Sequence, residues 1–223
     1  MSTFRNLGVT PALCEALETQ GISSPFPIQT ATLPDAIKGR DVLGRGQTGS
    51  GKTLAFGLAM MTRLNGRTAK PHKPLGLILS PTRELAVQIN DVVSPLARRI
   101  GLSSQVVAGG LSYIGQIQAL KRGVPIIVAT PGRLIDLLEK KHIDLSDVMI
   151  TVLDEADQMA DMGFLPVVKE ILSLTKDDGQ RLLFSATLDR DVDSLVKRFL
   201  KDPITHSLNQ FWGKNEGVIF ETV

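Results

Sequence analysis

The sequence predicts an α/β fold in which a parallel β-sheet carries helices on both faces. Short apolar runs alternate with helix-like patterns over most of the 223 residues, as in a succession of strand–helix units. A glycine-rich segment, Gly46–Thr53, follows the first of these runs, and an acidic segment, Asp154–Asp157, follows a later one. Because ligands of parallel sheets bind beyond the carboxyl ends of the strands, we expect both segments to meet along one edge of the sheet.

Six segments have the composition of strands that are buried on both faces. Most are continuous runs of leucine, isoleucine and valine, and each is short enough to be a single strand. In chain order the predicted strands are residues 41–44, 75–80, 104–108, 125–129, 148–153 and 181–184.

Helical periodicity appears between these strands. A helix is expected from Leu54 to Leu64, directly after the glycine-rich segment. A second helix, in which Pro95 is expected to cause a kink or a restart, is predicted from apolar residues at helical spacing: Leu85, Ile89, Val92, Leu96 and Ile100. A last helix, ended by Pro203, is predicted from Val192, Leu195, Val196 and Phe199. Residues 65–74 are polar and basic, and we expect a mobile, solvated loop.

The composition is that of a globular protein. Hydrophobic residues make up 43% of the chain and charged residues 22%, which predicts a folded core and not disorder. The net charge of +2 is too small to indicate a nucleic-acid partner by itself. The single cysteine, Cys14, is interpreted as a small apolar residue on a helix after Pro11, and it fits a reducing compartment. No signal peptide or apolar run of 18 residues is present, so a cytoplasmic protein without membrane contact is expected.

The segment Gly46–Thr53 fits the pattern G-x-x-x-x-G-K-[ST] of loops that bind nucleotide phosphates. In such a loop the backbone N–H groups point inward at the phosphates, and glycines keep side chains out of the way. The lysine, here Lys52, reaches the β- and γ-phosphates, and the hydroxyl of Thr53 ligates Mg²⁺. The alternative, a glycine-rich turn without a ligand, is disfavoured because a predicted strand precedes the segment and a predicted helix follows it.

The acidic segment follows the apolar residues 148–153 directly, which argues against an ordinary acidic helix start. Asp154 is predicted to hold Mg²⁺, through water, because this ion keeps several of its waters. Glu155 is the candidate for orienting and deprotonating an attacking water. Together the two segments predict a protein that binds a nucleoside triphosphate.

These segments belong to an ordered series of motifs that resembles the DEAD-box ATP-dependent RNA helicase family, from about Phe4 to about Ser207. Phe4 stands 17 residues before Gly21, which opens a segment similar to the adenine-reading motif of the family, Gly21–Gln29. The other motifs follow in order: Gly46–Thr53, Pro81–Ala86, Gly109-Gly110, Thr130–Arg133, Asp154–Asp157 and Ser185–Thr187. The resemblance implies a RecA-like P-loop NTPase domain with ATP and Mg²⁺ as cofactors. Gly46 stands where the family usually has alanine, and we expect this smaller residue to be tolerated.

The resemblance also implies which residues bind the nucleotide. Gln29 offers one amide donor and one acceptor, the pair needed to read N6 and N7 of adenine, and Phe4 is expected to stack on the ring. Taken without the family, Gln29 is a polar residue that opens a helix and Phe4 is a core residue. The implied catalytic residues are Lys52, Asp154 and Glu155, and the implied phosphate-binding residues are Gly46, Gln47, Thr48, Gly49, Ser50, Gly51, Lys52 and Thr53.

Three further motifs resemble RNA-contacting segments of the family. They combine hydroxyls at helix starts, glycines and arginines, which suit phosphate and sugar: Pro81, Thr82, Arg83, Gly110, Thr130, Pro131, Gly132 and Arg133. The expected partner is RNA, single-stranded or a short duplex, bound with little sequence preference. Two alternatives stay open. Thr130-Pro131 is also a good helix start, and Arg83 is equally able to form an internal ion pair.

Ser185 and Thr187 resemble the coupling motif of the family, and we expect them to bond to the acidic motif, which ends at Asp157. Ordinary polar capping after a strand is the alternative. The N-terminal RecA-like domain is expected to cover residues 1–208, with the adenine-motif region in residues 1–39, and residues 209–223 are expected to form a linker or an irregular tail.

We expect that residues 1–223 do not include the second RecA-like domain of the family. That domain carries an arginine-rich motif that completes the ATP site, and it is expected to be needed in cis or in trans for full activity. The chain alone is therefore expected to bind ATP and RNA weakly. The alternative function is a truncated, non-catalytic RNA- or protein-binding module with a vestigial ATP site.

Overall fold

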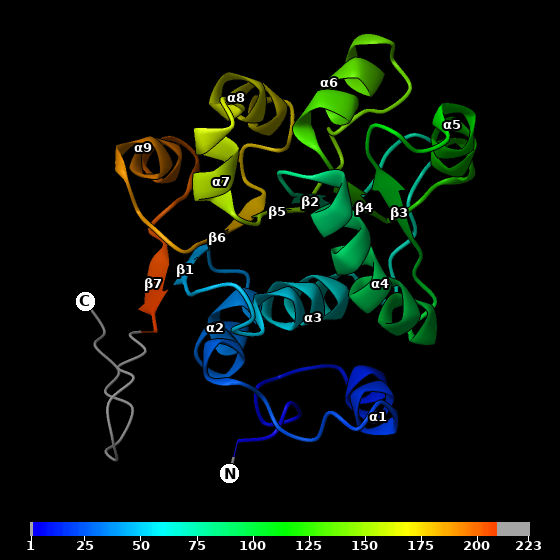
Figure 1. The fold of residues 1–223 in the computed structure, drawn as a ribbon. Coiled ribbons are helices and arrows are strands. Elements are labelled where there is room, and N and C mark those ends of the chain that lie inside the picture. Colours follow the sequence, from blue (N-terminus) through cyan, green and yellow to red (C-terminus); the bar gives the residue numbers. More distant parts are fainter. Residues whose placement is uncertain (1, 209–223) are drawn as a thin grey trace.

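Seven parallel strands form the sheet at the centre of the structure, a computed structural model that describes residues 2–208 (Figure 1). Their order across the sheet is β3-β4-β2-β5-β6-β1-β7, and every neighbouring pair is parallel. The strands are β1 (Val42–Arg45), β2 (Gly76–Leu79), β3 (Ser104–Val107), β4 (Ile126–Ala129), β5 (Ile150–Leu153), β6 (Gln180–Ser185) and β7 (Ile204–Ser207). The predicted fold class is confirmed.

Nine helices within residues 2–208 cover the two faces of the sheet. One core is built on α1 (Pro11–Thr19), α2 (Pro27–Ile37), α3 (Lys52–Leu64) and α4 (Arg83–Arg99). The other is built on α5 (Tyr113–Arg122), α6 (Pro131–Glu139), α7 (Ala156–Asp161), α8 (Leu165–Ser173) and α9 (Arg190–Phe199). None of these helices is long and apolar enough to cross a membrane.

The continuous apolar runs are explained by the two cores. Successive side chains of a strand point to opposite faces, so both sets of side chains must be apolar. In β2, Ile78 packs in the core of α1–α4, whereas Leu77 and Leu79 pack in the core of α5–α9. The single cysteine, Cys14, is buried on α1 as expected.

Two details of α4 differ from the prediction. The helix runs without interruption from Arg83 to Arg99, so Pro95 does not restart it. The missing N–H costs one backbone hydrogen bond on an exposed turn, and the buried face of the helix outweighs that cost. Val92 was assigned to the apolar stripe but is 37% exposed, and Val93 is buried in its place. A valine pair leaves the helical phase ambiguous by one residue.

Strand β7 was not predicted, because its sequence carries a weak signal. It contains a single aliphatic residue, Ile204, and all four of its residues are half-buried. Pairing with β1 makes it a strand, with Ile204 opposite Val42. His206 adds a contact to α2, since its Nε2 lies 2.9 Å from Oδ2 of Asp35.

The segment 65–74 is attached to its surroundings, in contrast to the mobile loop expected. The amide of His72 donates to the carbonyl of Leu120, and its ring Nδ1 lies 2.8 Å from the carbonyl of His142. Lys73 pairs with Asp144 at 3.1 Å. These long-range partners could not be seen in a polar, basic sequence. The predicted tail, residues 209–223, lies outside the described residues.

Candidate nucleotide-binding site and nucleic-acid surface

The glycine-rich and acidic segments meet at the carboxyl edge of three neighbouring strands. β6 lies between β1, which leads into Gly46–Thr53, and β5, which leads into Asp154–Asp157. The amide of Gly46 donates to the carbonyl of Ser185 at the end of β6, over 3.2 Å. The prediction that these segments share one edge of the sheet is therefore confirmed.

Lys52 and Glu155 form a buried ion pair at this edge. The Nζ of Lys52 lies 2.9 Å from Oε1 of Glu155 and also donates to the carbonyl of Gly46 at 3.1 Å. Both residues are less than 9% exposed. The hydroxyl of Thr48 donates to the same carboxylate oxygen at 3.4 Å. Charge-assisted hydrogen bonds of this kind fix the position of the lysine ammonium group.

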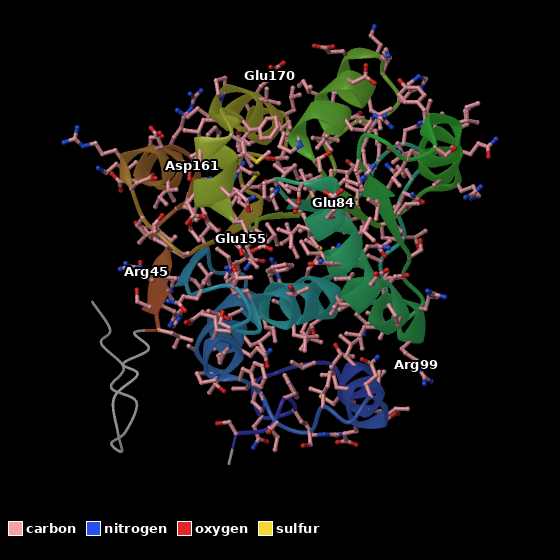
Figure 2. All side chains as sticks on the ribbon, in the orientation of Figure 1. Arg45, Glu84, Arg99, Glu155, Asp161 and Glu170 are labelled. Atoms are coloured by element: carbon pink, nitrogen blue, oxygen red, sulfur yellow. The ribbon has the colours of Figure 1, made fainter. Side chains whose placement is uncertain are left out.

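Glu155 adopts an unusual backbone conformation. Its φ and ψ are 51° and 53°, in the left-handed region, at the residue that precedes α7. This conformation is uncommon for a residue with a side chain, and such strain concentrates at functional sites. Glu155 lies near the centre of the molecule, where α7 begins (Figure 2).

Asp154 is a buried carboxylate without a full set of partners. Burial raises its pKa to about 7, the charge of Lys52 opposes the shift and the charge of Glu155 adds to it. Its Oδ1 is buried and accepts no hydrogen bond within the described residues. An orphaned carboxylate oxygen at this position fits a cation, which would supply the missing contact.

The residues present fit Mg²⁺ and a nucleotide phosphate together. The carboxylate of Asp154 and the hydroxyl of Thr53 supply two oxygens. Within the described residues, no group of three histidine, cysteine, aspartate or glutamate side chains could hold a metal ion. Mg²⁺ usually takes several waters and substrate phosphates as ligands beside one or two carboxylates, and two protein oxygens suit that arrangement. Six backbone N–H groups of the loop make no hydrogen bond in residues 2–208, namely those of Gln47, Thr48, Gly49, Gly51, Lys52 and Thr53. Unpaired amides at the start of the 13-residue helix α3 form a cradle for anions.

Both adenine-motif residues, Phe4 and Gln29, are buried. Phe4 is 4% exposed and packs in the core, as the alternative interpretation held, and its stacking on adenine stays a prediction. Gln29 is 2% exposed, accepts from the amide of Phe26 at 2.8 Å and donates to the carbonyl of Gly51 at 3.0 Å. It therefore joins the start of α2 to the phosphate loop.

Phe26 was missed as a candidate residue. Its side chain is 56% exposed, and a Cβ added to Gly51 would come within 2.7 Å of its ring. Among residues 2–208, Phe26 is the one aromatic residue that is large, apolar and exposed, and it lies beside the phosphate loop. The available signal was an aromatic residue between two prolines, Pro25 and Pro27, directly before Gln29.

The coupling residues contact the acidic motif. The carboxylate of Asp157 accepts from the amide and the hydroxyl of Thr187 at 3.0 and 2.9 Å. The amide of Asp157 donates to the hydroxyl of Ser185 at 3.2 Å. Burial raises the pKa of Asp157, but the hydrogen bonds from Thr187 and Ser185 outweigh it and leave the pKa below its usual value. The expected bonding between the two motifs is confirmed.

The residues with expected RNA contacts follow the other half of the sheet. β3, β4 and β2 are neighbours, and their carboxyl ends lead into Gly109-Gly110, Thr130–Arg133 and Pro81–Arg83. β2 also neighbours β5, so this row continues the edge that carries the nucleotide site. The sheet order thus places the two sets of motifs side by side.

Some side chains on this proposed RNA surface have partners within the protein, and others do not. The hydroxyl of Thr82 caps α4 by accepting from the amide of Leu85, whereas that of Thr130 makes no capping bond to α6. Arg83 pairs with Glu84 at 2.8 Å, as the alternative interpretation held. The guanidinium of Arg133 lies 5.0 Å from the centre of the Tyr113 ring. Thr130 and Pro131 are also an ordinary helix start.

Comparison with known proteins identifies the family. A sequence model described as DEAD/DEAH box helicase matches residues 26–195. The chain belongs to this family. It carries the DEAD form of the acidic motif, because the fourth residue is Asp157.

Several curated DEAD-box relatives are similar to nearly the whole chain. DEAD-box ATP-dependent RNA helicase 30 of Arabidopsis thaliana is 45% identical over 205 residues, which is 91% of this chain and 35% of the relative. ATP-dependent rRNA helicase RRP3 of Gibberella zeae is 43% identical over 93% of this chain and 42% of its own length. RNA helicase CrhR of Synechocystis sp. is 43% identical over 94% of this chain and 42% of its own length. The chain thus spans about two fifths of the relatives it matches.

Proposed function

We propose that residues 1–208 are the N-terminal, ATP-binding RecA-like domain of a DEAD-box RNA helicase, with the adenine-motif region in residues 1–39. In this proposal the protein couples ATP binding and hydrolysis to RNA binding and local duplex unwinding. The observation that carries it is the ion pair between Lys52 and Glu155, beside a buried carboxylate oxygen of Asp154 that lacks a partner. A buried carboxylate whose pKa is raised beside a specific charge partner is typical of a functional site.

Nucleotide binding is proposed to exchange the partners of Lys52. The loop amides bind phosphate oxygens, and Lys52 leaves Glu155 for the phosphates because they carry more charge. Glu155 is then free to orient a water and to accept its proton at a carboxylate oxygen. Asp154 and Thr53 would hold Mg²⁺, which when bound neutralises phosphate charge.

RNA binding and coupling are proposed for the neighbouring part of the same edge. The proposed RNA-contacting residues lie in Pro81–Arg83, at Gly110 and in Thr130–Arg133, with phosphate and sugar as their targets. Asp157, Ser185 and Thr187 form the hydrogen-bonded link between the acidic motif and β6. Through these hydrogen bonds, a rearrangement of Glu155 would be transmitted to β6. A second RecA-like domain, in cis or in trans, is proposed to close on this surface. The cytoplasmic location expected from the sequence, which has a single cysteine and no recognised signal peptide, stays a prediction that fractionation of cells would check.

Calorimetric titration with ADP and GDP in the presence of Mg²⁺ tests the nucleotide site. We expect ADP to bind more tightly than GDP. Lys52→Ala should weaken both by at least about tenfold, because one charge-assisted contact to phosphate is lost. The matched control is Lys121→Ala, which removes an exposed lysine on α5 and should change neither affinity. Absence of nucleotide binding would favour the alternative, a binding module with a vestigial ATP site.

The variant Gln29→Ala distinguishes two roles of Gln29, recognition of the adenine base and stabilisation of the phosphate loop. Because Gln29 also bonds to Gly51, its loss can weaken all nucleotides equally. Reading of adenine predicts something more specific, namely that the ratio of GDP to ADP dissociation constants falls toward one. An unchanged ratio would leave Gln29 a structural residue only.

Fluorescence anisotropy with two unrelated single-stranded RNAs of equal length tests the proposed RNA surface. We expect weak, salt-sensitive binding with similar affinity for both, because backbone contacts carry no sequence information. Strong discrimination between the two sequences would contradict the proposed contacts.

A further inference from the structure

A groove lies between the C-terminal ends of α6 and α8 and the segment that follows α6. Its volume is about 640 Å³, and its apolar lining includes Ile135, Leu138, Leu145 and Leu174. Leu174, directly after α8, is 45% exposed. The volume lies within the range of about 300–1,000 Å³ that is typical of pockets for small ligands, so the groove has room for a few side chains.

The groove is remote from the nucleotide and RNA candidates. Those residues follow the carboxyl ends of strands and open helices, whereas the groove lies where α6 and α8 end, toward the segments that lead back into β5 and β6. In Figure 1, α6 and α8 lie next to each other on the face of the sheet that α5–α9 cover. In Figure 2, Glu170 marks the part of α8 that faces the groove. A partner in the groove would leave the other sites accessible.

One wall of the groove is held in place by long-range hydrogen bonds. The amide of Asp144 donates to the carbonyl of His72 at 2.9 Å, and the ring of His72 contacts the carbonyl of His142 at 2.8 Å. Asp144 also accepts from the amide of Ser146 at 2.8 Å and pairs with Lys73. The other walls are helices, so the site is largely formed before a ligand arrives, which lowers the entropy cost of binding.

The charges at the groove indicate the chemistry of its occupant. Three carboxylates line it, those of Glu139, Asp144 and Glu170, against one ammonium group, that of Lys141. Asp144 is already paired with Lys73, whereas Glu139 and Glu170 are exposed and form no ion pair within residues 2–208. An apolar groove with two unpaired carboxylates at its margin suits apolar side chains flanked by positive charge, and it disfavours the phosphates of RNA.

We propose that this groove docks a short peptide segment of another protein. Leucine- or isoleucine-like side chains of the segment fill the space between Leu138 and Leu174, and a lysine or arginine pairs with Glu139 and Glu170. α6 and α8 both belong to the sheet face that carries the acidic motif and the Thr130–Arg133 motif at its other end. The docked segment therefore binds the same rigid layer as these motifs without covering them.

Methyl NMR of the full chain tests the proposal with two defined probes. The first is an eight-residue peptide of leucines and lysines in amphipathic order, and the second has glutamates in place of the lysines. We expect the basic peptide to shift the methyl signals of Ile135, Leu138 and Leu174 in a saturable way, and the acidic peptide to leave them unchanged. Equal shifts from both peptides, or shifts that fall elsewhere, would overturn the proposal.

Charge reversal supplies the matched variants. Glu139→Lys combined with Glu170→Lys should weaken the basic peptide about tenfold, because two attractions become repulsions. Glu18→Lys introduces the same change on the remote helix α1 and should leave its affinity unchanged. ADP titration of each variant shows whether the fold is intact. The inference is refuted if the double variant binds like the unmodified chain, if single-stranded RNA shifts the same methyl signals, or if dilution alone shifts them and so reveals a second copy as the occupant.

Discussion

Single side chains at the candidate nucleotide site are held by partners that a ligand would replace. Lys52 is hydrogen-bonded to Glu155, and most amides of the phosphate loop have no partner within residues 2–208, so the site is arranged to bind an anion. On the proposed RNA surface, Arg83 likewise forms an ion pair with Glu84 that a ligand would replace. Such pairs can be exchanged at modest cost, since each group keeps a partner in both states.

Gly110 should be far less tolerant of alanine than its neighbour Gly109. Gly110 has a φ of +76°, and a Cβ there would collide with the guanidinium of Arg83. Gly109→Ala meets nothing within 4 Å. We expect Gly110→Ala to cost about 1–2 kcal/mol of stability and to weaken RNA binding about threefold to tenfold by displacing Arg83.

Urea unfolding and RNA anisotropy on both variants check this difference. Gly109→Ala is the control and should match the unmodified chain in both measurements. Equal effects of the two substitutions would show that the conformation at Gly110 and its contact with Arg83 do not matter.

Thr187→Ala should make stability depend less on acid pH. The hydrogen bonds to Asp157 keep its pKa below the usual value in the folded state. Stability from a depressed pKa is present above the pKa of the unfolded chain, about 3.9, and is lost as the pH falls through the folded value. The variant should therefore be less stable at pH 7, by about 0.5–1 kcal/mol after solvent screening, and the difference should shrink below about pH 4.

Urea unfolding of both proteins at several pH values between 7 and 3.5 provides the measurement. Ser194→Ala, which removes another exposed hydroxyl–backbone bond, is a control whose effect should not vary with pH. A constant difference between Thr187→Ala and the unmodified chain over the whole range would mean that the hydroxyl does not act on the charged form of Asp157.

At the level of elements, α4 shows tertiary packing prevailing over local preference. The helix continues through Pro95, on its exposed side, because Ile89, Val93 and Leu96 are buried on the other side. Pro95→Ala restores the amide that can donate to the carbonyl four residues earlier. We expect it to stabilise the chain by about 1–2 kcal/mol, the helix gain being offset in part by a more flexible unfolded state.

Thermal and urea unfolding would detect that increase. Val93→Ala on the buried side of the same helix should act in the opposite sense, because it removes buried apolar atoms and leaves a cavity. A loss of stability in Pro95→Ala would show instead that the geometry imposed by proline is required for packing on β3.

In the whole molecule, the order of the strands determines how the motifs are grouped. β5, β6 and β1 bring the phosphate loop, the acidic motif and the coupling residues together, while β2, β4 and β3 carry the proposed RNA contacts. Within residues 2–208, no arginine forms a hydrogen bond or ion pair with Gly46–Thr53 or with Asp154–Asp157. An arginine opposite the phosphates accelerates phosphoryl transfer by about 10³–10⁵.

The polypeptide of residues 1–223 should therefore show negligible RNA-stimulated ATP hydrolysis and no duplex separation. One rigid domain also has no second arrangement for ATP to select. Phosphate release should rise by at least about 10³-fold when a second RecA-like domain of a relative is fused after residue 223, and Glu155→Gln in that fusion should abolish the gain. Robust turnover by the isolated polypeptide would show that another copy or another arginine completes the site.

The local patterns of the chain were sufficient to predict most elements and most of the site. The predicted strands agree with β1 to β6 to within two residues at every end, because continuous apolar runs are a local property of strands buried on both faces. The phosphate loop and the acidic motif could be recognised for a similar reason, since their chemistry depends on residue types at fixed spacing. The family followed from their order along the chain.

Only the tertiary structure decided which distant residues become neighbours. Strand β7 forms because it pairs with β1. Phe4 is a core residue because it packs in the cluster of α1–α4. Gln29 bonds to Gly51 because α2 lies beside the phosphate loop. The groove between α6 and α8 likewise depends on helices that are separated along the chain. Sequence determined the local conformation and the reactive groups of this protein. Packing determined their partners, because contacts between segments far apart in the chain depend on the shape of the whole fold.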